Sequence, residues 1–154
     1  LTTVEDFEVN RPFREVADTF QKMAPQCLNK TVKTTSRTYQ SYQVIVTTYK
    51  ATVQVHPDKA ELHVQQLHEK GVLNVSKVPP GGYYLIVTDA TPMGSGKTRI
   101  DMYHPTAGVG ETMTKAITSW ATGDNIGCPD RSFFFSGSKD KGFAFHRHRF
   151  LNKL

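Results

Sequence analysis

The sequence predicts an α+β domain over residues 10–130, followed by a C-terminal extension over residues 131–154 with the pattern of a β-hairpin. Two segments with apolar residues three and four positions apart predict helices near the two ends of the domain. Between them, several segments rich in β-branched and aromatic residues predict strands. Because short connections favour antiparallel pairing, we expect an antiparallel sheet with the N-terminal and C-terminal helices packed on one face.

The composition is that of a globular domain with a single core. The chain has 154 residues, of which 38% are hydrophobic and 21% charged. No apolar run approaches the roughly 20 residues that a membrane-spanning helix needs. Residues 129–154 hold six lysines and arginines against two aspartates, and so carry +4 of the formal net charge of +5. The nearly neutral remainder argues against a nucleic-acid-binding core, whereas the basic extension suits an acidic partner.

The first predicted helix follows residues 1–9, which show no periodic pattern and are expected to form a mobile lead. Asn10 is the expected N-cap, and Pro12 suits the first helical turn. Pro25 is expected to kink or end the helix. The apolar stripe of this helix consists of Phe13, Val16, Ala17, Phe20, Met23 and Ala24, continued by Cys27.

The predicted strands occupy the middle of the chain. Residues 42–55 are rich in β-branched and aromatic residues and predict one strand or two. Residues 60–68 alternate except at Leu67, so a helix is an alternative to the strand that we favour. Residues 83–89 give the clearest strand pattern. Residues 98–103 alternate apolar and charged side chains, which is typical of an antiparallel strand with one wet face.

The second predicted helix follows residues 108–110 and ends at Gly123, a natural C-cap. The side chains that it is expected to bury are Val109, Met113, Ala116, Ile117 and Trp120.

The segment 93–98 ends in Gly-Lys-Thr, as a phosphate-binding loop does. That motif needs a glycine where this chain has Thr91, and backbone amides where Pro92 has none. It also needs a helix after the lysine and threonine, whereas a strand is predicted here. We therefore expect a hairpin turn and no nucleotide.

No catalytic residue, metal site or cofactor is predicted. His146 and His148 would share one face of a strand, but no third ligand is evident, and a solvated basic edge is the commoner explanation. The carboxylates Glu5, Asp6 and Glu8 fall in the expected lead, which makes paired acid–base chemistry unconvincing. No nucleophile motif stands out.

The C-terminal extension carries two aromatic runs around a polar turn. Such a hairpin is compatible with stacking on single-stranded nucleic acid or with docking on a partner surface. We favour the second because the rest of the chain is nearly neutral. The residues expected to bind the partner are Phe133, Phe134, Phe135, Phe143, Phe145, Arg147 and Arg149.

The only two cysteines, Cys27 and Cys128, each lie at the end of a predicted helix. Two buried free thiols and a disulfide are both compatible with that placement. The sequence argues against a zinc site in either case, since neither cysteine has a second cysteine or a histidine at ligand spacing. A disulfide would place the protein in an oxidising compartment.

The segments 26–28 and 120–129 resemble the corresponding parts of small lipoprotein domains of the Gram-negative bacterial cell envelope. Segments 82–87 and 96–103 are similar to the hairpin before the closing helix of those domains. The resemblance covers roughly residues 10–130. It implies a Cys27–Cys128 disulfide and a periplasmic location, anchored at the outer membrane through a lipid-bearing cysteine upstream of Leu1.

The resemblance and the basic extension together predict a non-enzymatic structural or interaction component of an envelope assembly. Its expected partners are other envelope proteins or cell-wall components, not nucleic acid or nucleotides. The alternative is a periplasmic domain that binds a small molecule or peptide in a pocket between the helices and the sheet. A hydrolase would need a cluster of catalytic side chains that the sequence does not reveal.

Overall fold

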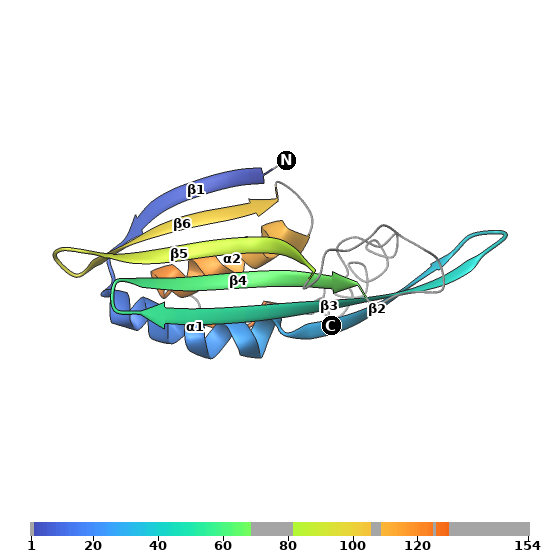
Figure 1. Ribbon diagram of the computed structural model, residues 1–154, viewed down its shortest axis with the longest axis horizontal. Coiled ribbons are helices and arrows are strands. Elements are labelled where there is room, and N and C mark those ends of the chain that lie inside the picture. Colours follow the sequence, from blue (N-terminus) through green and yellow to red (C-terminus); the bar gives the residue numbers. More distant parts are fainter. Residues whose placement is uncertain (1, 69–81, 106–108, 125, 130–154) are drawn as a thin grey trace, which may run out of the picture.

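The computed structural model of the chain describes residues 2–68, 82–105, 109–124 and 126–129. The described part contains six strands and two helices (Figure 1). In chain order they are β1 (Thr2–Val9), α1 (Phe13–Leu28), β2 (Lys30–Arg37), β3 (Tyr42–His56), β4 (Lys59–His68), β5 (Tyr83–Met93), β6 (Lys97–Pro105) and α2 (Val109–Thr122).

The strands form one sheet in the order β1-β6-β5-β4-β3-β2, and every neighbouring pair is antiparallel. The predicted α+β fold with an antiparallel sheet is confirmed. Strands β2 to β6 lie side by side in chain order. Strand β1 pairs with β6 and forms the edge of the sheet opposite to β2. The two helices contact each other and the sheet, and Figure 1 shows them behind it.

The expectation of a mobile lead before the first helix is wrong. Residues Thr2–Val9 form β1, which pairs with β6 from Thr2↔Pro105 to Val9↔Thr98. Its side chains alternate: Phe7 packs against the core and Val9 is buried. The three carboxylates of the strand hid this alternation in the sequence. They are tolerated because β1 lies at the edge of the sheet, where charged residues are common.

One expectation for α1, its N-cap, is wrong, and a second is wrong in part, since Pro25 does not end the helix. The N-cap is Pro12, not Asn10, and no side chain caps the helix; the Pro12 carbonyl accepts hydrogen bonds from the amides of Glu15 and Val16 at 3.1 and 3.2 Å. Pro25 lies inside the helix, which continues to Leu28. The carbonyl that Pro25 leaves without a donor is on the exposed side of α1, where solvent can satisfy it.

The core lies between the helices and the sheet. It confirms the predicted apolar stripe of α1 and most of that of α2, since Phe20, Met113, Ile117 and Trp120 are buried. The Trp120 indole Nε1 donates a hydrogen bond to the Gly127 carbonyl at 2.9 Å. This bond draws the segment after α2 back onto the core, as a buried indole requires a partner.

The cysteines form a disulfide, as the resemblance implied. Cys27 at the end of α1 is bonded to Cys128 after α2, with 5.0 Å between the two Cα atoms. The bond therefore joins the C-terminal ends of the two helix segments.

Segment 94–96 is the turn between β5 and β6, which confirms the predicted hairpin. Ser95 and Gly96 have φ values of 72° and 71°, the left-handed conformation that such turns use. Strands precede and follow the glycines, so the helix that a phosphate-binding loop needs is absent from this place. No described helix is long and apolar enough to cross a membrane.

Candidate functional site

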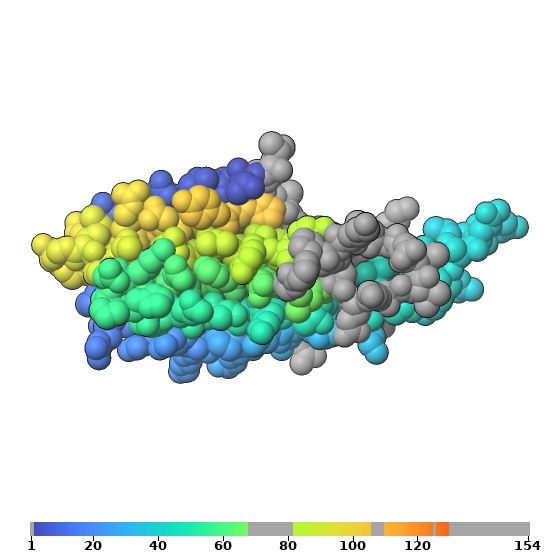
Figure 2. Space-filling model, viewed as in Figure 1, coloured from blue at the N-terminus to red at the C-terminus, as the bar shows by residue number. Residues whose placement is uncertain are grey.

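Strands β2 and β3 extend beyond the helices as a two-stranded ribbon (Figures 1 and 2). We call residues 33–46 the arm. The structure describes all of these residues and none of them is buried, whereas Val32 and Thr47 at the base of the arm are. The arm therefore begins where contact with the core ends.

The sequence of the arm accounts for its local structure. Strand β2 is rich in threonine, a β-branched residue that favours extended backbone. Its register with β3 runs without a break from Lys30↔Tyr49 to Arg37↔Tyr42. At the tip, the Thr38 amide donates to the Ser41 carbonyl at 2.9 Å, which closes the turn. An isolated hairpin of this kind is marginal in water, so the continuation of β3 into the sheet must anchor it.

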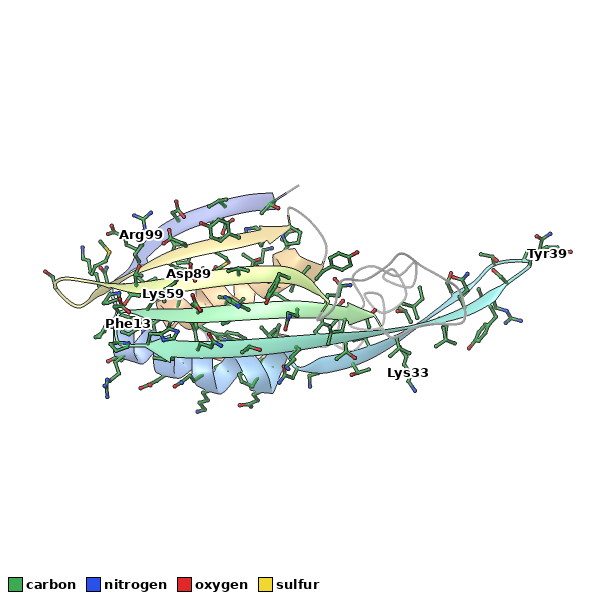
Figure 3. All side chains as sticks on the ribbon, in the orientation of Figure 1. Phe13, Lys33, Tyr39, Lys59, Asp89 and Arg99 are labelled. Carbon is green, nitrogen blue, oxygen red and sulfur yellow. A yellow bond between two sulfur atoms is a disulfide. The ribbon has the colours of Figure 1, made fainter. Side chains whose placement is uncertain are left out.

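Apolar side chains are exposed on both faces of the arm. Tyr39 at the tip is fully exposed, and Tyr42, Val44 and Ile45 are 67%, 43% and 42% exposed. Because Val44 and Ile45 are consecutive in a strand, they point to opposite faces. Figure 3 shows Tyr39 at the far end of the arm, away from the rest of the molecule. Clustered exposed apolar side chains of this kind mark interaction sites.

The arm is also cationic. It carries Lys33 and Arg37, and no aspartate or glutamate occurs from residue 29 to residue 57. Among the described residues, no carboxylate forms an ion pair with Lys33 or Arg37. Lys33 projects from the side of the ribbon in Figure 3. The arm thus offers positive charges that the rest of the described domain does not neutralise.

Strand β2 ends the sheet, and its outer edge has no strand partner in the described part of the chain. Within the described residues, no strand pairs with the backbone N–H and C=O groups on that side, which is the kind of edge to which an extended partner segment can add. The arm therefore combines an open backbone edge, exposed apolar side chains and unpaired cations.

The exposed face of the sheet carries a second group of charges. The Lys59 Nζ lies 3.0 Å from Glu61 Oε1 and 3.4 Å from Asp89 Oδ2. The hydrogen bond from Lys59 holds the pKa of Glu61 below its usual range. Ligand atoms of Glu61, His63 and Asp89 lie within 4.8 Å of one another, but a metal ion there would have to displace the Lys59 ammonium. This group fits a surface ion-pair network better than a metal site.

Arg99 extends the network toward the β1 edge. Its guanidinium lies 3.1 Å from Asp101 and 3.7 Å from Asp6 (Figure 3 labels Lys59, Asp89 and Arg99). Asp6 and Asp101 are register partners on neighbouring strands. Their proximity raises the pKa of Asp6, chiefly because its carboxyl shares a hydrogen bond with Asp101.

The residues predicted to bind a partner, from Phe133 to Arg149, lie outside the described residues, so their role stays a prediction. The sequence reasoning missed the arm and the pair Glu5–His104, which the β1–β6 register brings close together. The signal for the arm was present: a carboxylate-free stretch of β-branched and basic residues from 29 to 57.

No protein-family model and no curated protein matches the sequence. Among solved structures, the chain is similar to one described as a conserved protein from Geobacillus kaustophilus. The two share 14% sequence identity over 94% of this chain and 97% of that one, with a TM-score of 0.35. A likeness at that level assigns neither fold nor function, so the function is argued from the residues themselves.

Proposed function

We propose that this protein is a non-enzymatic interaction component of a bacterial envelope assembly, located in the periplasm and anchored at the outer membrane. The observation that carries the proposal is the arm, a ribbon of residues 33–46 without a buried side chain. Because none of these side chains is buried, the arm adds nothing to the packed core, and a role in binding a partner accounts for it best. The Cys27–Cys128 disulfide supports the proposed location, because disulfides persist in oxidising compartments such as the periplasm.

The partner in this proposal is another envelope protein with an acidic, partly apolar surface. Lys33 and Arg37 supply the complementary charge, while Tyr39 and Tyr42 supply apolar area with little loss of side-chain entropy. The open edge of β2 allows an extended partner segment to add to the sheet. In this arrangement both helices cover one face of the sheet, and the arm extends past them.

The basic, phenylalanine-rich extension over residues 131–154 is a second docking element in the proposal. It carries the aromatic and basic side chains that the sequence singles out, and it would bind the partner in addition to the arm. Two weak contacts on one chain strengthen each other through effective concentration.

The alternative, a small-molecule or peptide-binding domain with a pocket between the helices and the sheet, has less support. Phe20, Trp120, Leu62 and Ile86 are fully buried in that space and belong to one packed cluster. Catalysis also has less support, because the carboxylates of the Glu61, His63 and Asp89 group are held in ion pairs by Lys59.

The test is site-specific photo-crosslinking in native envelopes, with the cross-linker in place of Tyr39. We expect one acidic protein to be captured, and its yield to fall at least about tenfold in the double variant Lys33→Glu/Arg37→Glu. Lys97→Glu is the matched control, since Lys97 is exposed at the β5–β6 turn and should leave the yield unchanged. An equal loss in both variants, or a partner without acidic character, contradicts the proposal.

A second variant, lacking residues 131–154, separates the two docking elements. Reduced capture with the arm intact would assign part of the affinity to the extension. Unchanged capture would show that the arm acts alone.

A further inference from the structure

The two edge strands of the sheet carry opposite charge. Figure 1 shows β1 and β2 at opposite edges, and within the described residues neither has a strand on its outer side. Strand β1 has three carboxylates and no lysine or arginine: Glu5, Asp6 and Glu8. Strand β2 has three cations and no carboxylate: Lys30, Lys33 and Arg37. Charge at a sheet edge commonly discourages pairing with other chains, but opposite signs discourage it only between like edges.

The directions of the two edge strands allow the sheet of one copy to continue into that of another. The sheet has six strands and every neighbouring pair is antiparallel, so β1 and β2 run in opposite directions. When a second copy is placed beside the first without being turned over, its β1 is antiparallel to β2 of the first copy. The helices of both copies then lie on the same face of one continuous sheet.

The lengths and faces of the two strands select one register for this pairing. Each strand has eight residues, and end-to-end antiparallel alignment places Val9 of one copy opposite Lys30 of the next. The same alignment places Phe7 opposite Val32. Both of these side chains are on the face that the helices cover, since Val32 is buried and Phe7 packs against the core. A shift by one residue would pair Phe7 with a side chain of the other face.

This register also matches the charges on the open face of the sheet. Asp6 of one copy lies opposite Lys33 of the next, and Glu8 is a diagonal neighbour of the same lysine. All three side chains are exposed. Facing residues of opposite charge stabilise an antiparallel pair, and like charges destabilise it. Glu5 alternates to the other face, where its Oε1 lies 3.3 Å from His104 Nε2.

The surroundings of Asp6 within its own copy favour an added cation. Its carboxyl shares a hydrogen bond with Asp101, and this contact is the main reason that the pKa of Asp6 is raised. The guanidinium of Arg99 lies 3.7 Å from Asp6 but only 3.1 Å from Asp101. One arginine thus serves two carboxylates. An ammonium group from a strand added beside β1 would supply the second positive charge.

We propose that copies of this chain associate head to tail, with β1 of one copy added as an antiparallel strand to the outer edge of β2 of the next. The two contacting surfaces differ, so each copy keeps one edge of each kind and the assembly grows into a filament or ring. The inference rests on the proposed function for one element, the open edge of β2, and names a second copy as the segment that adds there. Tyr39 and Tyr42 lie outside the paired strands and remain for the envelope partner.

Sedimentation velocity of the full, disulfide-closed chain measures this association. The mean mass should rise with protein concentration at an ionic strength of about 0.01 M. It should fall by at least about twofold at about 1 M, because the screening length decreases from about 30 Å to about 3 Å. A chain that stays monomeric at low ionic strength, or a dimer that does not grow with concentration, would overturn the proposal.

Two charge-reversed variants test which edges meet. Asp6→Lys/Glu8→Lys makes both edges positive, and Lys33→Glu/Arg37→Glu makes both edges negative, so each variant alone should remain monomeric. An equimolar mixture of the two should assemble again, because every contact can then join a positive edge to a negative one. The neutral variant Asp6→Asn/Glu8→Gln keeps the shape of the side chains and should also assemble more weakly than the unaltered chain.

The matched control reverses two exposed carboxylates away from both edges. Asp18 lies on α1 and Asp58 at the turn between β3 and β4. The variant Asp18→Lys/Asp58→Lys has the same net charge as Asp6→Lys/Glu8→Lys and should assemble as the unaltered chain does. Failure of the mixture to assemble, or loss of assembly in the control, would contradict pairing of β1 with β2. Assembly of Lys33→Glu/Arg37→Glu alone would also contradict it, in favour of the basic extension as the contact.

The variant Asp6→Lys/Glu8→Lys separates this inference from the proposed function, since it leaves the arm unchanged. If the chain does not self-associate but cross-linking at Tyr39 still captures an acidic envelope protein, the head-to-tail contact is wrong and the function of the arm stands. If the chain self-associates through β1 and β2 but captures no such protein, the head-to-tail contact stands and the function of the arm is wrong.

Discussion

The guanidinium of Arg11, just before α1, donates a hydrogen bond at 2.7 Å to the backbone carbonyl oxygen of Trp120, near the end of α2. A second bond from the same nitrogen reaches the Ala121 carbonyl at 3.2 Å. Arg11 therefore satisfies carbonyls at the C-terminus of α2 that have no partner within the helix, and its charge is favourable at that end of the helix dipole.

Replacing Arg11 with methionine should lower the free energy of unfolding by about 2 kcal/mol, because part-buried carbonyls lose a charged donor. Urea denaturation followed by Trp120 fluorescence measures this change. Arg14→Met is the control, since Arg14 is exposed and should tolerate the change with little effect. Equal stability of the two variants would show that Arg11 contributes nothing to the end of α2.

Gly123 should not tolerate a side chain. Its φ of +79° is unfavourable for other residues, and an added Cβ would lie 3.1 Å from Arg11 Nε. We expect Gly123→Ala to lower the free energy of unfolding by about 1–2 kcal/mol. Gly94→Ala is the matched control, because a Cβ there meets nothing within 4 Å.

Reduction of the Cys27–Cys128 disulfide should destabilise the domain strongly. The bond closes a loop with a sequence separation of 101. The chain-entropy account gives about 4–5 kcal/mol for a loop of that length. Denaturation of the same protein with and without reductant measures the difference, and mass spectrometry of the two samples verifies the bond. A small difference would mean that the reduced, unfolded chain is already compact.

Shortening the arm should leave the domain intact. Thr34 and Ile45 are register partners, so Asn-Gly in place of residues 35–44 can close the hairpin with a two-residue turn. We expect the free energy of unfolding to change by less than about 1 kcal/mol, because none of the removed residues is buried. A larger loss would mean that the arm supports the fold.

The pKa of Glu61 should rise in the variant Lys59→Met, since the Lys59 hydrogen bond is the main cause of its depression. A carboxylate with a depressed folded-state pKa stabilises the fold above its unfolded pKa. That contribution is lost as the pH falls through the folded-state pKa. NMR titration of the Glu61 carboxyl measures the shift, and Lys97→Met should leave it unchanged.

Asp6 should behave in the opposite way. Its pKa is raised, first by the hydrogen bond with Asp101, so the folded state holds this proton more tightly than the unfolded chain does. Its contribution to stability therefore grows as the pH falls. In one NMR titration, the pKa of Asp6 should lie above the ordinary range of an aspartate and that of Glu61 below the ordinary range of a glutamate, and shifts in the opposite directions would contradict the assigned contacts.

Much of the fold follows from local patterns. The alternation of β4, the β5–β6 hairpin and the stripe of α2 were predictable because each element buries one face against the core. Strands β1 and β2 were not, since both lie at the edges of the sheet, where acidic residues in one and basic residues and threonine in the other weaken the apolar alternation. The helix continues past Pro25 because a proline on the exposed side of a helix leaves unpaired a carbonyl that water can satisfy.

The candidate sites were harder to predict for a different reason. Glu5 and His104 come from nearly opposite ends of the described chain and meet only because β1 pairs with β6. The arm depends on where the helices stop covering β3, which no local pattern encodes. The disulfide was implied by resemblance, since spacing alone could not distinguish it from two thiols.

The disulfide also sets the route that mechanical tension takes through the molecule. A pull between the two ends of the chain passes through β1 and α1 to Cys27, crosses to Cys128 and leaves by the C-terminal residues. Strands β2 to β6 and α2 lie inside the covalent ring and carry none of that load directly. A pull on the arm, in contrast, is applied inside the ring, between Cys27 and Cys128, and reaches both helices through β2 and β3.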